Sequence, residues 1–195
     1  AGPGTGLGED THLLTRARVH ADLRVGERFR VFGQLQAAGS DGRDGGPRPS
    51  IDRDSLGLQQ LFVEAGLPGG SALRLGRQEL SFGVGRLISV RAGPINVRQP
   101  QDGLRWILRR GSWRADVFAA RVVDTRPGRF DDSSSDGAEL FGIYLTRGRP
   151  YVSPRGVELY LFRADRDTAT YFSGVGREER ASLGARAWLR TGRWS

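Results

Sequence analysis

The sequence predicts an all-β fold, an antiparallel up-and-down transmembrane β-barrel, and two observations carry that prediction. First, apolar and polar residues alternate with a period of two from Leu13 to Val25 and again from Phe29 to Ala37, with a Gly26-Glu27 turn between them. Second, these strands are about ten to thirteen residues long, whereas strands of soluble proteins usually have about five or six. A strand of this length with one apolar and one polar face suits a tilted crossing of a bilayer.

The same alternation continues along the chain and gives about nine strands in all. After the long polar loop 39–55, further strands are expected at about 56–65, 72–82, 103–109, 112–123, 138–146, 157–161 and 179–190. The alternation is blurred around Gly76, which indicates a β-bulge at that residue. Two more long connections, 83–102 and 124–137, are rich in glycine and polar residues and are expected to be loops.

The lengths of the connections predict the topology. Short connections follow the first, third, fifth and seventh strands, and long ones follow the second, fourth, sixth and eighth. Bacterial barrels have short periplasmic turns and longer extracellular loops, so the first strand should run toward the periplasm. The N-terminal end of this chain would then lie outside the cell, whereas bacterial barrels begin in the periplasm, and nine is an odd number of strands although such barrels have even numbers. We therefore interpret residues 1–11 as a loop and 12–195 as a partial outer-membrane β-barrel domain.

Charge and composition narrow the functional classes. The 195 residues carry a net charge of +8, all 30 basic residues are arginine, and cysteine is absent. The charge predicts an anionic partner, and the lack of cysteine excludes a disulfide framework and a cysteine metal site. The arginines alternate along strands and do not cluster with stacking aromatics, so nucleic acid is not an expected partner.

No motif predicts chemistry. The two histidines, His12 and His20, have no triad pattern around them, and the glycine-rich start lacks the lysine of a phosphate loop. For Asp131, Asp132 and Asp136 a solvated loop is favoured over a calcium site. The sequence therefore predicts a protein that is not an enzyme and has no cofactor and no metal.

One stretch of about thirty residues is specific enough to indicate a family. It contains Leu-Gly-Arg-Gln-Glu-Leu at 75–80, Gly-Arg-Leu at 85–87, Asn-Val-Arg at 96–98 and Asp-Gly-Leu-Arg at 102–105. This stretch resembles the alginate export family, and residues 13–35 are similar to an early hairpin of that family. The resemblance implies an outer-membrane barrel of about eighteen strands with an arginine-rich lumen. At roughly 22 residues per strand and connection such a barrel needs about 400 residues, so this chain would be a fragment of about half.

Alternation and resemblance together give the candidate substrate-binding residues of the lumen. Alternation gives Arg16, Arg18, Arg24, Arg30, Arg74, Arg105, Arg109, Arg114, Arg180, Arg186 and Arg190. The resemblance adds Arg77, Arg86 and Arg98. The planar guanidinium can hydrogen-bond both oxygens of a carboxylate, and rings of basic residues line anion-selective pores. Interleaved Asp22, Glu64, Asp116 and Glu158 would keep the lumen from trapping anions. For any single arginine, a structural ion pair between neighbouring strands is the competing interpretation.

Three functional hypotheses follow. The leading one is an outer-membrane channel that passively exports an anionic polysaccharide, alginate or a similar polyuronate. The second is an anion-selective porin for small organic acids or phosphate. The third is a soluble antiparallel β-sheet protein with a binding or structural role. The partners expected under the first hypothesis are the polysaccharide, outer-membrane lipid and periplasmic export-complex proteins.

Overall fold

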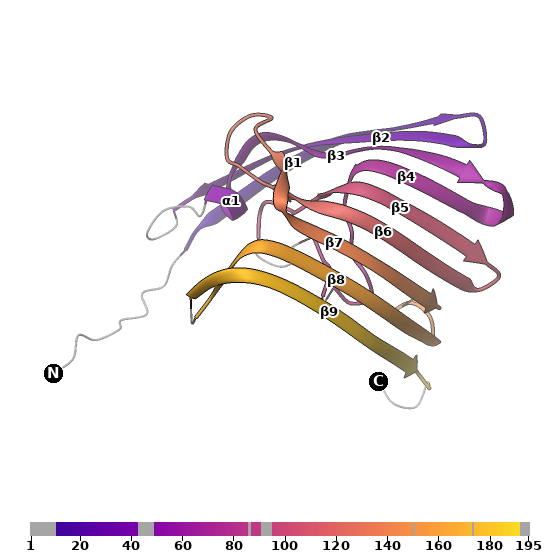
Figure 1. Ribbon diagram of the computed structural model, residues 1–195. Coiled ribbons are helices and arrows are strands. Elements are labelled where there is room, and N and C mark those ends of the chain that lie inside the picture. The colour runs from indigo at the N-terminus through magenta and orange to yellow at the C-terminus, as the bar shows by residue number, and fades with distance from the viewer. Residues whose placement is uncertain are drawn as a thin grey trace.

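Nine antiparallel strands follow one another in chain order across a single sheet in the part of the chain that the structure describes (Figure 1). This computed structural model describes residues 11–42, 49–85, 87–90, 95–149, 151–172 and 174–191. The strands are β1 (Leu13–Val25), β2 (Phe29–Asp41), β3 (Asp54–Leu67), β4 (Ser71–Gln78), β5 (Gln101–Arg110), β6 (Trp113–Asp124), β7 (Ser133–Arg147), β8 (Arg155–Tyr171) and β9 (Gly174–Leu189). Two short helices, α1 (Pro49–Asp52) and the 3-10 turn η1 (Pro68–Gly70), lie in connections.

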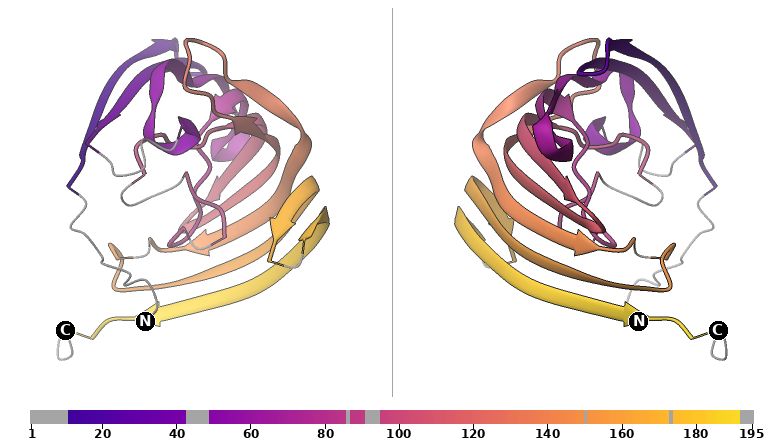
Figure 2. Two further views of the ribbon diagram at one scale, coloured as in Figure 1. Left: turned by 90° about the vertical axis from the view of Figure 1, so that its left-hand side faces the viewer. Right: turned by 90° about the vertical axis from the view of Figure 1, so that its right-hand side faces the viewer.

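The all-β, up-and-down antiparallel prediction is confirmed. Every strand pairs with its neighbour in sequence, from β1 with β2 to β8 with β9. Figure 2 shows the sheet curving into an open trough with β1 and β9 at its edges. The sheet is not closed, because β1 and β9 do not pair with each other among the described strands. No helix in the described ranges is long and apolar enough to cross a membrane.

The strand boundaries differ from the prediction mainly at the end of the sheet with the long connections, which we call the loop end. β7 begins at Ser133 and not near 138, because Ser133 and Ser134 pair with β6 beyond a register shift after Arg121. β8 and β9 extend to Tyr171 and Gly174, so a tight hairpin replaces the long connection expected after the eighth strand. The opposite end, with the connections 26–28, 68–70, 111–112 and 148–154, is called the turn end.

The bulge expected at Gly76 is absent, since the pairing of β4 with both neighbours runs through Gly76 without a register shift. Gly76 instead has a φ of +126°, and a Cβ atom there would lie 2.3 Å from the carbonyl oxygen of Leu61. This close approach of β3 and β4 requires glycine and explains the blurred alternation.

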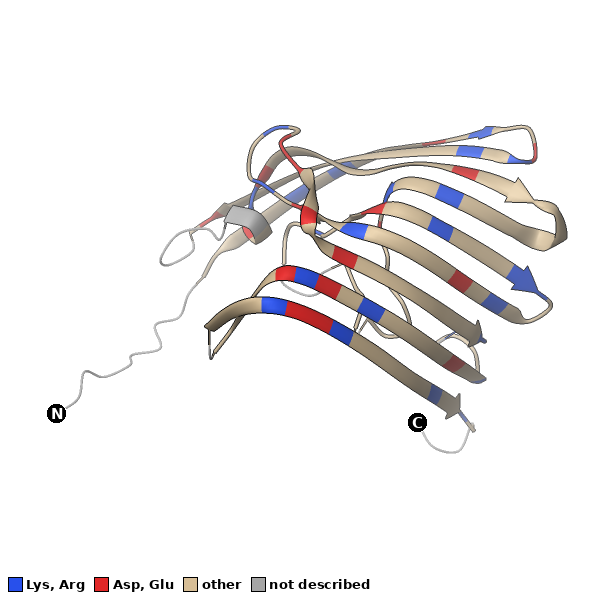
Figure 3. Cartoon of the chain, in the orientation of Figure 1, with Lys and Arg blue, Asp and Glu red and all other residues tan. Residues whose placement is uncertain are grey.

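The convex face of the sheet is apolar. Side chains at alternate positions, such as Val19, Leu104 and Leu183, point away from the trough and are exposed by 73%, 42% and 84%. They do not share a core with one another, unlike the outward side chains of a soluble sandwich. Toward the loop end the apolar rows give way to charge, and Figure 3 shows charged residues gathered there on β8 and β9.

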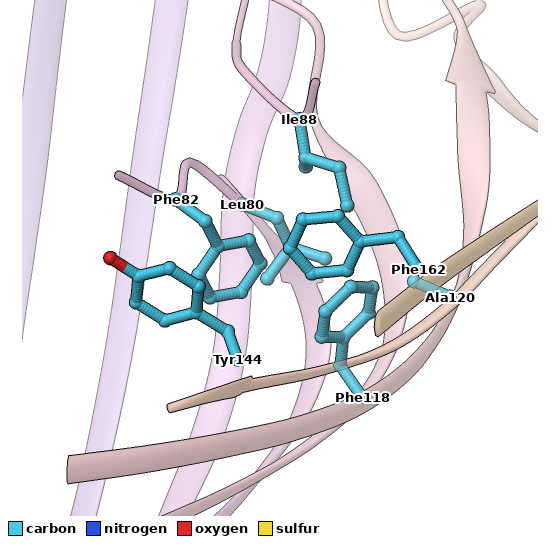
Figure 4. Close-up of a cluster of buried hydrophobic side chains, with 7 residues drawn as sticks. All are labelled: Leu80, Phe82, Ile88, Phe118, Ala120, Tyr144 and Phe162. Atoms are coloured by element: carbon cyan, nitrogen blue, oxygen red, sulfur yellow. The ribbon is translucent and has the colours of Figure 1, made fainter. Parts of the chain in front are cut away.

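The described parts of the connection between β4 and β5, residues 79–85, 87–90 and 95–100, fold back into the trough and are called the inward loop. Leu80, Phe82 and Ile88 from this connection pack against Phe118, Tyr144 and Phe162 of β6, β7 and β8 (Figure 4). The ring of Phe82 lies 5.1 Å from that of Phe118 and 5.0 Å from that of Tyr144, centroid to centroid. This buried cluster on the concave face is the main apolar core of the molecule.

A single asparagine anchors the far end of this inward loop. The Asn96 side-chain amide donates to the carbonyl oxygens of Thr15, Gly39 and Asp52, at 2.9, 2.8 and 3.0 Å. Its backbone N–H donates to the carbonyl oxygen of Ile51. The loop is therefore fixed at one end to the aromatic cluster and at the other to β1, β2 and α1.

Candidate functional site

A row of guanidinium groups crosses the concave face near the turn end. The register aligns Arg24 of β1 with Arg30 of β2, then Glu64, Arg74 and Arg105 on the next three strands. Directly paired residues of antiparallel strands project from the same face of the sheet, so these five side chains form one row. Four of the five are arginines that alternation predicted to lie on this face.

Carboxylates and aromatic rings hold several of these arginines in place. Arg30 donates to both carboxylate oxygens of Asp22, at 2.8 and 3.0 Å. The Nε atom of Arg74 donates to Glu64 at 2.9 Å, and its guanidinium lies 4.0 Å from the ring centre of Phe62. A guanidinium held by a carboxylate and an aromatic face is fixed in position but keeps unused donors on its free edge.

A triad around a buried carboxylate continues the row on β5 and β6. Asp116, which is 1% exposed, accepts hydrogen bonds from Arg105 at 2.8 Å and from Arg114 at 2.7 Å. Two guanidiniums share one carboxylate, so the triad keeps a net charge of about +1 where it meets the trough. Arg109 is aligned with Arg114 and adds a further guanidinium to the same face.

A second charged group lies on β7, β8 and β9. Glu158 is buried and accepts a short hydrogen bond from the Tyr144 hydroxyl, together with an ion pair from Arg186 Nε at 2.9 Å. The Arg186 guanidinium also lies over the ring of Trp188. The inward loop at Phe82 and Gly83 touches both this group and the cavity beside Arg105 and Arg114, so it stands between the two.

The inward loop also brings together arginines that are distant in sequence. Arg16 donates to the carbonyl oxygen of Asn96 at 3.0 Å, and Arg98 pairs with Glu79 at 3.0 Å. Glu79 in turn accepts from Gln59 of β3. The alternation predicted Arg16 as a candidate and the family resemblance predicted Arg98. The inward loop places both at one edge of the trough.

The remaining candidates are spread more widely. Arg180 pairs with Glu178, and Arg190 donates to the carbonyl oxygen of Tyr151. Arg18 is aligned with Gln36 on the first hairpin, on the same face as Arg16 and Arg24. Arg86 lies outside the described residues. Whether any of these side chains contacts a substrate stays a prediction.

Arg77 lies on the other face. It is aligned with Leu61 and Asp102, and it shares the face of Leu73 and Leu75. Its guanidinium donates to both oxygens of Asp102 at 2.9 Å. Arg77 is thus the first member of a row of charged residues that crosses the convex face at the edge of the apolar surface. The other members, aligned in register on the following strands, are Asp102, Arg121, Glu139, Asp165 and Glu179.

Aromatic side chains on the concave face are the part of the site that the candidate residues did not include. Several lie flat over glycines of the neighbouring strand, where a Cβ atom would collide with the ring. Phe118 and Phe162 cover Gly142, Tyr160 covers Gly184, and Trp188 covers Gly156. Tyr160 and Phe162 alternate on the face of Glu158, and this pattern is the sequence signal for an aromatic as well as a charged concave face.

Two carboxyl groups lie close together at the loop end. They are outside the apolar stretch of β3, whose last exposed apolar residue toward the loop end is Leu61. Asp54 and Asp132 flank Gly57, whose Cβ atom would lie 2.4 and 3.1 Å from their Oδ2 atoms. Burial, with the nearby charges of Asp132 and Asp131, raises the pKa of Asp54 from 3.8 to about 7. Burial also raises the pKa of Asp132. This pair therefore holds a proton at pH values where an unfolded chain has lost it.

These features define a class of protein: an antiparallel meander with an apolar convex face and an arginine-rich concave face that holds an inward loop. A family model described as alginate export matches residues 2–193, so the chain belongs to the alginate export family. A comparison with curated proteins found no match. The family consists of outer-membrane export proteins, and membership supports a role in polysaccharide export.

Proposed function

We propose that this chain forms part of the wall of a closed outer-membrane β-barrel through which an anionic polysaccharide, alginate or a similar polyuronate, passes without chemical change. The observation that carries the proposal is the arginine row Arg24, Arg30, Arg74 and Arg105 on the concave face, directly behind an apolar convex face. Apolar side chains outside and guanidiniums inside are the arrangement that a lipid-embedded anion channel needs.

The height of the apolar face supports a membrane position. On β3 the outward positions Leu67, Ala65, Val63 and Leu61 are all apolar, and on β6 they are Trp113, Ala115, Val117 and Ala119 before Arg121 begins the charged row. Four alternate positions cover about 20 Å along the strand at about 3.3 Å per residue, which is about 15 Å of height at the tilt of about 40° that strands have in membrane barrels. This stretch covers more than half of the apolar band of outer-membrane barrels, which is about 25 Å tall.

Closure of the barrel needs strands beyond β1 and β9. Both edges expose long rows of backbone groups, which in a bilayer have no water to bind and must pair. A barrel of nine strands would fill its bore with side chains, whereas a polysaccharide needs a wider lumen. The proposal therefore includes a larger barrel, of about eighteen strands, to which this sheet contributes one side.

The arginines suit a polyuronate because it carries one carboxylate per sugar. Each guanidinium has five donors, and the bonds to Asp22, Glu64 or Asp116 use only some of them. A passing carboxylate can bind the remaining donors while the protein carboxylate stays in place. The nearby acids weaken each such contact, and a polymer can then leave as well as enter.

The test uses the full-length protein that contains this chain, reconstituted in planar lipid bilayers. We expect anion-selective currents that short oligouronates block at concentrations where phosphate does not. The double variant Arg24→Gln and Arg74→Gln should shift the reversal potential toward cations and weaken the block. Arg163→Gln, which removes an exposed arginine of the convex face, is the matched control and should change neither.

Three outcomes would contradict the proposal. Block by phosphate at the same concentration as by oligouronate would favour a porin for small anions. Recovery of the protein from the soluble fraction without detergent would favour a soluble sheet. Shortened oligouronates after passage would show that the protein alters its substrate.

A further inference from the structure

A cavity of about 260 Å³ lies on the concave face between the inward loop and strands β7 to β9. Gly83 and Leu87 of the loop close one side, and Tyr144, Glu158, Tyr160 and Arg186 line the other. We call it the Tyr160 pocket. Its volume lies just under the range of about 300–1,000 Å³ typical of small-ligand sites, so it suits a single ring and not an extended ligand.

The apolar side of the pocket is an aromatic platform held rigid by its neighbours. The rings of Tyr160 and Phe162 stack with centroids 5.1 Å apart and an angle of 12° between their planes. Tyr160 also lies against Gly184 of β9, where a Cβ atom would sit 2.3 Å from its Cζ atom. Both contacts fix the tyrosine ring before any ligand arrives, and a preorganised ring costs little entropy on binding.

The polar side of the pocket combines one carboxylate and one guanidinium. Glu158 is fixed by the Tyr144 hydroxyl and by Arg186, whose Nε atom lies 2.9 Å from Oε2. That contact is an ion pair without hydrogen-bond geometry, so it leaves the donors of Arg186 unused, and the guanidinium lies over the ring of Trp188. The loop comes close only because Gly83 has a φ of +61° and no side chain, since a Cβ atom there would lie 3.1 Å from Glu158 Oε2.

We propose that the Tyr160 pocket binds one uronate ring of the polymer. One face of a pyranose consists of carbon-bound hydrogens, which are apolar and pack on an aromatic ring. With that face on Tyr160, the sugar carboxylate pairs with Arg186 and a sugar hydroxyl donates to Glu158. A purely electrostatic lumen would hold any anion, whereas this pocket recognises an anionic sugar.

This inference rests on the proposed function, and it adds a defined resting position to the route of the polymer. Stacking and the carboxylate contact together slow each ring at this point. The pocket lies beside the inward loop, at the place where the loop separates it from the Arg105, Arg114 and Asp116 triad.

The experiment records single-channel blockades in the full-length protein with a trimeric uronate, and with a neutral pyranose trimer of equal length. Replacing Tyr160→Leu should shorten the uronate blockade by roughly 3- to 10-fold, the value of one aromatic contact. Tyr160→Phe keeps the ring and should retain the wild-type duration. Arg186→Gln should shorten the uronate blockade and leave the weaker blockade by the neutral trimer unchanged.

Tyr171→Leu is the matched control, because Tyr171 is an exposed aromatic of the same strand, β8, far from the pocket. Unchanged electrophoretic mobility of the folded form establishes that each variant folds. If the wild type is blocked and Tyr160→Leu is blocked for equally long, the pocket is not a sugar site, although export still stands. If the wild type shows no uronate blockade, the proposed function fails and the pocket assignment falls with it.

Discussion

The triad of Arg105, Asp116 and Arg114 gives a prediction whose size follows from the structure. Asp116 is 1% exposed and accepts bonds of 2.8 and 2.7 Å from the two arginines. Replacing Asp116→Ala leaves two guanidiniums close together with no shared carboxylate. Removing one partner of a buried charge pair costs about 3–5 kcal/mol, because the remaining charge is left without compensation.

The matched control is Asp165→Ala, which removes the partner of Arg163 on the convex side. The Arg163 side chain is largely exposed, so this ion pair should contribute little to the free energy of unfolding. The assay is urea unfolding of both variants in detergent or liposomes, followed by tryptophan fluorescence. We expect a loss for Asp116→Ala several times that for Asp165→Ala.

For Asp116→Ala we expect conduction and stability to change in opposite directions. Without Asp116 the concave face gains positive charge, so the channel should become more anion-selective while the fold becomes less stable. Equal unfolding free energies for the two variants, within about 1 kcal/mol, would refute the reasoning that Asp116 neutralises the buried Arg105 and the partly exposed Arg114.

Three further predictions concern the loop end, the inward loop and β4. The pKa of Asp54 is raised to about 7 in the folded protein, so the contribution of this group to stability is fully present below about pH 4 and is lost as the pH rises through 7. The free energy of unfolding should fall by at most about 4 kcal/mol over this range, and by less because solvent screens a half-buried group. The protection factor of the Phe130 amide, which donates to the Leu56 carbonyl, should therefore fall between about pH 4 and 7 in wild type but not in Asp54→Asn. A wild-type protection factor that is independent of pH would contradict this. Asn96→Ala removes three hydrogen bonds that anchor the inward loop and should increase single-channel conductance and proteolysis within 79–100, and an unchanged conductance would show that the loop does not narrow the lumen. Gly76→Ala places a Cβ atom 2.3 Å from a carbonyl oxygen and should destabilise the sheet by more than about 1 kcal/mol in urea, whereas Gly69→Ala, with open space around it, should cost only its backbone strain.

The sequence predicted the sheet best where the two faces differ most. Along β1 and most of β2 apolar residues alternate with charged or polar ones, and the predicted faces agree with the exposed apolar residues of the structure. At the loop end of β8 and β9 both faces carry charge, as at Arg163, Asp165 and Arg166. The alternation is lost there because both faces of the strand contact water, so the sequence predicts a loop where the structure has a hairpin.

The structure gives the residues of the family motif a physical role. Gly76 allows β3 and β4 to approach, Gln78 donates to the carbonyl oxygen of Gly103, and Leu80 enters the aromatic cluster. Asn96 then fixes the other end of the same loop. The motif residues are therefore largely the ones that fold a 22-residue connection into the trough, between Gln78 and Gln101.

The sequence alone determined the strands, their order and which side chains share a face, because a period of two is a local property of an extended backbone. Tertiary structure decided which arginines meet which acids, and that Arg77 lies on the convex face beside Asp102. It also decided the inward path of 79–100 and the pocket beneath it. These depend on register between strands and on contacts such as that of Asn96 with Thr15, which lie 81 residues apart and leave no periodic trace in the chain.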